Sequence, residues 1–234
     1  MTVDDYYDRY WREGVAGWAV EAPLTAHTSQ FLSDETRGRR VLDFGGGDGR
    51  RYGAVIRSAA KSVTVADVSR EVLRDRSLAG DAVVHIDELP HLAEEFDVVL
   101  FLEVLEHLLD PLASLRLGAS KLRSGGEVVI SVPNAFSWHN RLRMLAGRLP
   151  ASGAGGREGV RGRTYVAPHI RFFDLDSLLH LVEAANLEVL SVQTDARSEW
   201  KFARLPTLTA MRPVRRGLWS ELTSLTYLVT ARVP

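Results

Sequence analysis

The clearest pattern of chemically useful residues is an acid followed by alternate glycines, namely Asp43, Gly45, Gly47 and Gly49. Glycine lacks a Cβ and tolerates positive φ, so backbone amides in such a turn can approach a ligand closely. The spacing excludes the dinucleotide fingerprint, which needs glycine where Arg50 stands, and no Gly-Lys-Ser/Thr sequence follows for a phosphate loop. A carboxylate repels phosphate and accepts hydrogen bonds from ammonium groups, so the ligand near Asp43 is expected to be cationic. A glycine-rich turn without any ligand is the alternative.

A second carboxylate stands at the expected place for a nucleoside ligand. Asp67 ends the alternating apolar segment 62–67, about twenty residues beyond the glycines, where doubly wound folds place an acid on the ribose hydroxyls. The alternative, which is compatible with ribose binding, is an N-cap for a helix beginning near Ser69.

Histidines beside charged residues occur in two further segments. Glu106 and His107 follow the apolar segment 95–101, and a histidine oriented by a carboxylate can accept a proton near neutral pH. His169 and Arg171 are suited to proton transfer and to anion binding, respectively. The alternatives are structural roles, in which these residues cap the next helix or tie a loop down by hydrogen bonds.

These residues must be positioned by an alternation of strands and helices. Strands are expected at residues 41–44, 62–67, 82–86, 95–101, 127–132, 187–192 and 225–233, and helices at 112–122, 137–147 and 175–185, with further helices beginning near Tyr52 and Ser69. Ser124-Gly125-Gly126 is expected to end the helix at 112–122 as a C-cap turn. Alternating strands and helices predict an α/β fold with a parallel sheet and right-handed crossovers.

Three motifs resemble one enzyme family. The loop after Asp43 is similar to motif I of the class I S-adenosylmethionine-dependent methyltransferases. Residues 102–107 resemble the E-x-L-E-H segment of ubiquinone-type O-methyltransferases and of methionine-biosynthesis W-like proteins, and His169-Ile170-Arg171-Phe172-Phe173 resembles their H-x-R-x-F element. The resemblance covers residues 40–134 and, more loosely, 169–190. It implies a Rossmann-like seven-stranded sheet, mostly parallel with an antiparallel last strand, with helices on both faces.

The resemblance also implies roles for individual residues. The residues expected to bind the cofactor S-adenosyl-L-methionine are Asp43, Gly45, Gly46, Gly47, Asp67, Val68, Asp87, Glu88, Leu102 and Glu103. The residues expected on the acceptor side are Tyr10, Glu106, Asn134, His139 and Arg171, with His107 and His169 as candidate catalytic bases. No metal site is predicted.

A single methyltransferase domain is expected, with three additions to its core. Residues 1–36 carry Tyr6, Tyr10 and Trp18 and are expected to form a helical lid, although a helix docked on the core explains them equally well. Residues 135–168 form an expected insertion on the substrate side, whose arginines suit an anionic or sugar-like acceptor unless they are simply solvated. Residues 197–220 form a second expected insertion.

Composition limits the remaining possibilities. The 234 residues carry a formal net charge of -1 and no cysteine, so neither a nucleic-acid partner nor a thiolate zinc site is expected. No segment has the apolar length of a membrane span, and a cytoplasmic monomer or homodimer without membrane contact is expected. The resemblance to methyltransferases implies methylation of an oxygen or nitrogen atom on a small molecule. A cofactor-binding partner protein of the methionine-biosynthesis W-like type, without turnover of its own, is the alternative.

Overall fold

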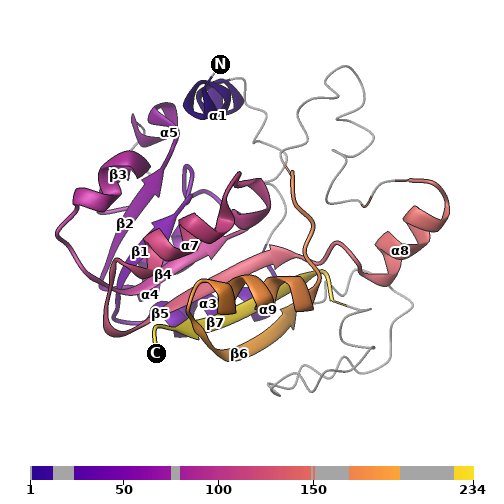
Figure 1. The fold of residues 1–234 in the computed structure, drawn as a ribbon. Helices are drawn as coiled ribbons and strands as arrows, with labels where there is room; N and C mark the ends of the chain where they lie inside the picture. The colour runs from indigo at the N-terminus through magenta and orange to yellow at the C-terminus, as the bar shows by residue number, and fades with distance from the viewer. Residues whose placement is uncertain (1, 13–23, 75–79, 149, 151–168, 196–223) are drawn as a thin grey trace. The chain divides into compact units, whose positions relative to one another are not determined.

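A computed structural model describes residues 2–12, 24–74, 80–148, 150, 169–195 and 224–234 (Figure 1). The strands are β1 (Arg40–Phe44), β2 (Ser62–Asp67), β3 (Ala82–His85), β4 (Phe96–Leu102), β5 (Leu122–Pro133), β6 (Glu188–Asp195) and β7 (Thr226–Arg232). The helices are α1 (Val3–Arg12), α3 (Ala26–Thr36), α4 (Gly53–Ala59), α5 (Arg70–Arg74), α7 (Pro111–Ala119), α8 (Trp138–Leu145) and α9 (Leu175–Ala184), with the short 3-10 helices η1 (Ile86–His91) and η2 (Leu105–His107).

The seven strands form one sheet in the order β3-β2-β1-β4-β5-β7-β6. β1 pairs in parallel with β2 and with β4, and β2 pairs in parallel with β3. The last strand, β7, runs opposite to β5 (Figure 1). The predicted fold class, a mostly parallel Rossmann-like sheet with an antiparallel last strand, is therefore confirmed.

The central strands are buried along most of their length. Val41 pairs with Val63 on one side and with Val98 on the other, and Val41 and Val98 have no exposed surface. Strands covered by helices on both faces read as continuous apolar runs, and β4 is apolar and buried from Val98 to Leu102. The rings of Phe44 and Phe101 stack with centroids 4.6 Å apart at the carboxyl ends of β1 and β4.

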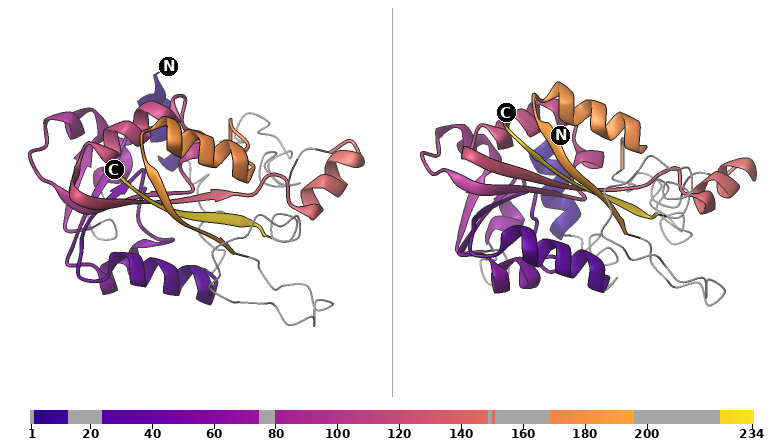
Figure 2. Two further views of the ribbon diagram at one scale, coloured as in Figure 1. Left: turned by 60° about the horizontal axis from the view of Figure 1, so that its bottom comes forward. Right: turned by 90° about the horizontal axis from the view of Figure 1, so that it is seen from below.

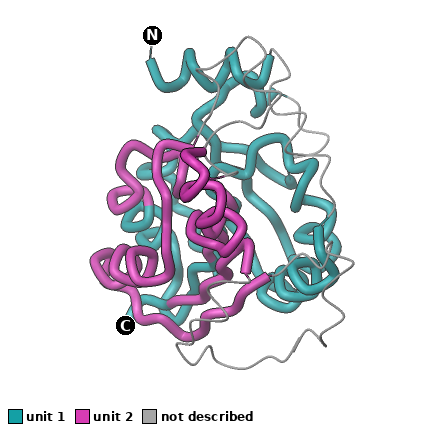
Figure 3. The backbone as a smooth tube through the Cα atoms, turned by 90° about the vertical axis from the view of Figure 1, so that its right-hand side faces the viewer, with its two compact units in different colours: residues 1–102, 115–129, 232–234 teal, residues 103–114, 130–231 magenta. Residues whose placement is uncertain are grey.

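The chain divides into two compact units (Figure 3). The first consists of residues 1–102, 115–129 and 232–234, and the second of residues 103–114 and 130–231. In the first unit α3 and α4 lie side by side on one face of the strands (Figure 2). In the second unit α9 packs on β6, and its first turn is closed by a capping box in which Asp174 accepts a hydrogen bond from the Ser177 amide.

The predicted end of the helix at 112–122 is wrong. Ser124-Gly125-Gly126 does not end a helix, because α7 already ends at Ala119 and β5 begins at Leu122. The Lys121 amide donates to the Gly118 carbonyl, which closes the helix, and the Lys121 carbonyl accepts from the Phe96 amide at the start of β4. In the sheet β5 lies between β4 and β7, and the local sequence does not reveal these neighbours.

Several predicted features lie outside the described residues. They are Trp18 of the expected lid, most of the insertion at 135–168 including its last arginines, and the whole insertion at 197–220. Among the described residues, no helix has the length and apolar character that crossing a membrane requires.

Candidate active site

The backbone conformation of the loop after β1 accounts for its glycines. Gly45, Gly47 and Gly49 have φ values of 71°, 57° and 70°, so each alternate position adopts the left-handed conformation that favours glycine. Gly46 is required for a different reason, since a Cβ there would lie 2.5 Å from Oδ2 of Asp43. The loop thus folds around the Asp43 carboxylate and leaves backbone atoms on its surface.

Asp67 joins this loop to the end of β2. Its Oδ2 accepts a hydrogen bond from the Gly47 amide at 3.0 Å, and its Oδ1 accepts from the Ser69 amide at 2.8 Å. The side chain is 6% exposed. The cap of α5 comes from Ser69, whose Oγ accepts from the Val72 amide at 3.3 Å, so Asp67 is not itself the helix cap.

The two buried carboxylates have perturbed proton affinities. Burial and the nearby Asp67 raise the pKa of Asp43 to about 7. Burial also raises the pKa of Asp67 to about 6, against the lowering effect of hydrogen bonds from the amides of Ser69, Gly47 and Val68. A ligand with a positive charge and hydroxyl groups would stabilise both ionised forms, so these residues fit the amino-acid and ribose parts of S-adenosylmethionine.

These shifts predict a pH dependence of stability. Folded-state pKa values above the ordinary 3.8 mean that the folded protein keeps protons that the unfolded chain releases from about pH 4 upward. This contribution to stability is fully present below about pH 4 and is lost as the pH rises through about 6 to 7. We expect a lower Tm for the ligand-free protein at pH 8 than at pH 5.5, with a smaller difference in Asp43→Asn. An unchanged difference in that variant would contradict the assignment.

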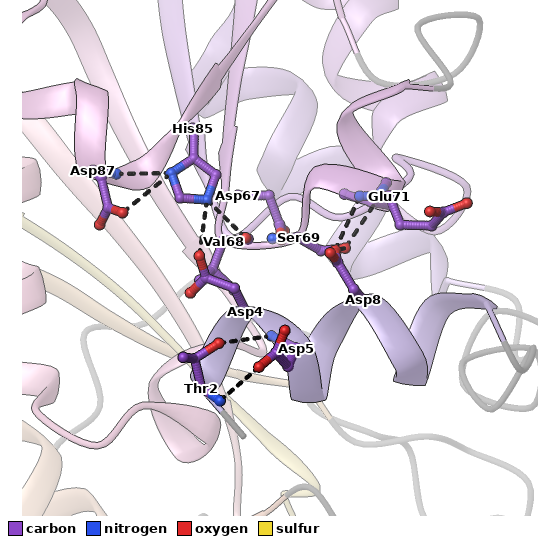
Figure 4. Close-up of polar contacts among 11 residues, drawn as sticks. Thr2, Asp4, Asp5, Asp8, Asp67, Val68, Ser69, Glu71, His85 and Asp87 are labelled. Atoms are coloured by element: carbon purple, nitrogen blue, oxygen red, sulfur yellow. Dashed lines mark hydrogen bonds and ion pairs between the residues drawn. The ribbon is translucent and has the colours of Figure 1, made fainter.

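The segments that follow β2 and β3 are linked by His85 (Figure 4). Its Nε2 lies 2.9 Å from the Val68 carbonyl oxygen, and its Nδ1 accepts from the Asp87 amide at 3.3 Å. The expected cofactor residues Asp87 and Glu88 lie in η1, where both side chains are exposed. The His85 ring is buried and bridges two expected cofactor segments.

Helix α1 contacts the same set of loops. Asp8 accepts hydrogen bonds from the Ser69 hydroxyl at 2.7 Å and from the Glu71 amide at 3.0 Å. A Cβ on Gly47 would lie 2.8 Å from Cζ2 of Trp11, so that ring packs directly on the glycine loop. Tyr10, an expected acceptor-side residue, is half-buried, and burial raises its pKa to about 12. Asp8 was not expected at the site, whereas Trp11 lies on the N-terminal segment that was expected to form a helical lid.

Leu102 is the last residue of β4, and Glu103 follows it directly. Leu102 is 7% exposed and belongs to the first unit. Glu103, in the second unit, has a φ of 56°, which is unusual for a residue with a side chain. Its Oε1 accepts from the Ser131 hydroxyl at 2.5 Å, and its amide donates to the Ser131 carbonyl at 2.9 Å. The strained backbone is therefore held by β5.

The second unit brings Glu106, His107 and His169 together. Oε1 of Glu106 lies 3.8 Å from Nε2 of each histidine, and the two rings meet edge to face with centroids 4.7 Å apart. The Glu106 side chain is 1% exposed, whereas His107 is 19% exposed. Burial and the neighbouring His107 lower the pKa of His169 to about 3, so this imidazole stays neutral. By their mutual distances, the three side chains could also hold a metal ion.

Arg171 positions the loop that carries this trio. Its Nε donates to the Leu108 carbonyl at 2.8 Å, and Nη2 donates to the Leu109 carbonyl. The amides of Ile170 and Arg171 both donate to the Glu106 carbonyl. This geometry favours the structural alternative for Arg171 over direct contact with an acceptor.

Asn134 and His139 lie in other surroundings. Asn134 is 2% exposed, and its Nδ2 donates to the Ser224 carbonyl while Oδ1 accepts from the Phe136 amide. It therefore shapes the turn after β5. His139 is exposed on α8 with its ring edge-on to Trp138.

A cavity of about 270 Å³ opens in the second unit. Its lining combines aromatic, apolar and charged side chains, namely Phe136, Arg141, Met144, Asp174, Leu175, Asp176 and Tyr227. Nε of Arg141 donates to the Phe136 carbonyl at 2.7 Å, which fixes the guanidinium at the cavity. A small ligand with an apolar body and polar groups fits this lining.

The chain matches the family described as a methyltransferase domain over residues 18–192. It belongs to this family. The predicted resemblance to class I S-adenosylmethionine-dependent methyltransferases is confirmed, and the expected cofactor is confirmed at the level of the family.

Relatives of this methyltransferase-family protein include ubiquinone biosynthesis O-methyltransferases. The protein of Xanthomonas campestris pv. campestris (strain B100) is 40% identical over 106 residues, which are 42% of this chain and 44% of that protein. The protein of Idiomarina loihiensis is 31% identical over 168 residues, which are 68% of this chain and 66% of that protein. The chain thus spans less than half the length of the first of these relatives.

Solved structures show the same fold. Magnesium protoporphyrin IX methyltransferase from Synechocystis PCC 6803, crystallised with bound SAH, superposes with a TM-score of 0.58 at 12% sequence identity. The alignment covers 99% of this chain and 98% of that chain. At this identity the likeness concerns the architecture alone.

Proposed function

We propose that the chain transfers the methyl group of S-adenosylmethionine to an oxygen or nitrogen atom of a small molecule. The observation that carries this proposal is the glycine loop with φ positive at alternate positions, hydrogen-bonded through the Gly47 amide to the buried Asp67. In this proposal Asp67 accepts hydrogen bonds from the ribose hydroxyls, and the Gly45–Gly47 backbone and Asp43 hold the charged amino-acid part. Val68, Asp87, Glu88 and Leu102 of the first unit are also assigned to the donor in this proposal.

The bound cofactor supplies an electrophilic methyl group on a sulfonium whose leaving group is a neutral thioether. The acceptor atom must then lose a proton as it becomes the nucleophile. We assign this proton to the His107 imidazole, because the Glu106 carboxylate, which faces its Nε2, stabilises the imidazolium that forms. His169 is the weaker base, because a pKa of about 3 leaves little affinity for the proton. Alignment of the acceptor and exclusion of water should supply most of the acceleration.

The acceptor is proposed to be small and to carry an anionic or sugar-like group. The cavity of about 270 Å³ supports this proposal, because Phe136 and Tyr227 offer flat apolar contacts while Arg141 can bind an anion or hydroxyl groups. Asp174 and Asp176 also line the cavity. Their carboxylates can accept hydrogen bonds from hydroxyl or amino groups, which favours a polyfunctional acceptor over a simple carboxylic acid.

Two measurements test the function. Titration calorimetry with S-adenosylhomocysteine should detect binding to the purified protein, and binding should be weakened in Asp67→Ala. A panel of phenols, sugars, amines and carboxylates, assayed by release of S-adenosylhomocysteine, should then identify a substrate. Absence of binding would refute the proposal. Binding without turnover on any acceptor would instead favour a partner protein of the methionine-biosynthesis W-like type.

A further inference from the structure

His85 occupies a junction of three segments in the first unit (Figure 4). The ring comes from the end of β3, Nε2 faces the Val68 carbonyl after β2, and Nδ1 faces the first turn of η1. Asp4 of α1 approaches the same ring, with Oδ2 at 3.6 Å from Nε2. The His85 side chain is 2% exposed, so these protein groups are its surroundings.

The contacts define one tautomer. Because the Asp87 amide donates to Nδ1, that nitrogen carries no proton, and Nε2 must hold the proton that it donates to the Val68 carbonyl. The lone pair on Nδ1 then faces the Asp87 amide and is not available to a metal ion. The carboxylates that face the ring are Asp4 on α1, Asp87 on η1, at 3.5 Å from Nδ1, and Asp67 at the end of β2.

We propose that His85 is a positioning residue for the nucleoside half of the methyl donor. Its ring ties the Val68 carbonyl to the Asp87 amide and so fixes two segments in one arrangement, one beside the ribose-binding Asp67 and one carrying Asp87. This inference rests on the proposed function, in which these two segments bind the methyl donor. His85 itself touches neither the donor's methyl group nor the acceptor.

This role predicts that loss of His85 weakens donor binding and leaves turnover largely unchanged. Loss of the bridge releases the segments after β2 and β3, while the glycine loop that holds the amino-acid part keeps its own hydrogen bond to Asp67. Donor affinity should therefore fall, and turnover at saturating donor should persist. The lost affinity should come from contacts with the nucleoside part of the donor.

Three substitutions separate the two hydrogen bonds of the ring. His85→Leu removes both, His85→Gln can keep a donor near the Nε2 position, and His85→Asn can keep an acceptor near the Nδ1 position. We expect the Leu variant to raise Kd for S-adenosylhomocysteine and KM for the donor by about 10- to 30-fold, and each amide variant by about 2- to 5-fold. The value of kcat should stay within about twofold, and binding of adenosine should weaken in parallel. His91→Gln changes an exposed imidazole at the end of η1 and serves as the matched control.

A spectroscopic readout accompanies the kinetics. The imidazole ¹⁵N resonances of the wild-type protein should report the Nε2–H tautomer for His85, and a protonated Nδ1 would overturn the proposal. If S-adenosylhomocysteine fails to bind even the wild type, the proposed function is wrong. If the wild type binds it and the folded His85 variants bind equally well, or lose kcat instead of affinity, the inference about His85 is wrong. If the Leu variant does not fold, the affinities of the two amide variants and the ¹⁵N resonances still test the role of His85.

Discussion

Replacing His107 with alanine is expected to lower kcat by about 10²- to 10⁴-fold, the usual contribution of a general base, while Kd for S-adenosylhomocysteine changes less than about twofold. The reason is its place in the second unit, where it lies within 3.8 Å of the buried Glu106 carboxylate and is itself 19% exposed. Its neighbour His169 cannot easily replace it, because burial and the adjacent ring lower the pKa of His169 to about 3. Single-turnover rates at saturating acceptor would measure the effect.

His180→Ala is the matched control for this experiment. His180 is an exposed imidazole on α9 in the same unit, so its removal should leave both kcat and Kd unchanged. Equal turnover in the two variants would remove His107 from the chemistry. A fall in donor affinity with kcat preserved would assign it to binding instead.

Asp67→Ala is expected to weaken binding of S-adenosylhomocysteine by about 10²- to 10⁴-fold. Hydrogen bonds to a charged acceptor contribute about 1.5–3 kcal/mol each, and the side chain is proposed to accept from two ribose hydroxyls. It also accepts from the Gly47 and Ser69 amides, so the variant loosens the glycine loop as well. Calorimetry gives the change in Kd, and the Tm of the ligand-free variant separates loss of contact from loss of structure.

Two comparisons sharpen the test of Asp67. Asp34→Ala removes an exposed carboxylate of α3 in the same unit and should bind like the wild type. Asp67→Asn keeps an acceptor for one amide and removes the charge, so it should lie between the wild type and the alanine variant. Equal Kd values for Asp34→Ala and Asp67→Ala would show that Asp67 does not contact the donor.

The sequence alone determined the elements that depend on local properties. The strand at Ser62–Asp67 was predicted with both ends correct, because its apolar alternation and terminal acid are local signals. Gly45, Gly47 and Gly49 were expected to form a turn, and each needs a positive φ that glycine alone adopts easily. From these features the order of strands and helices, and with it the fold class, could be inferred.

The arrangement of the candidate site was decided by the tertiary structure. His107 and His169 are 62 residues apart in the numbering, and no local pattern shows that their rings meet edge to face beside Glu106. The contact of Asp8 with Ser69, the bridge made by His85 and the early start of β5 were missed in the same way. The physical reason is that residue type and spacing fix local dihedral preferences and the face on which a side chain lies. Hydrogen bonds between distant segments form only where the folded chain brings their donors and acceptors together.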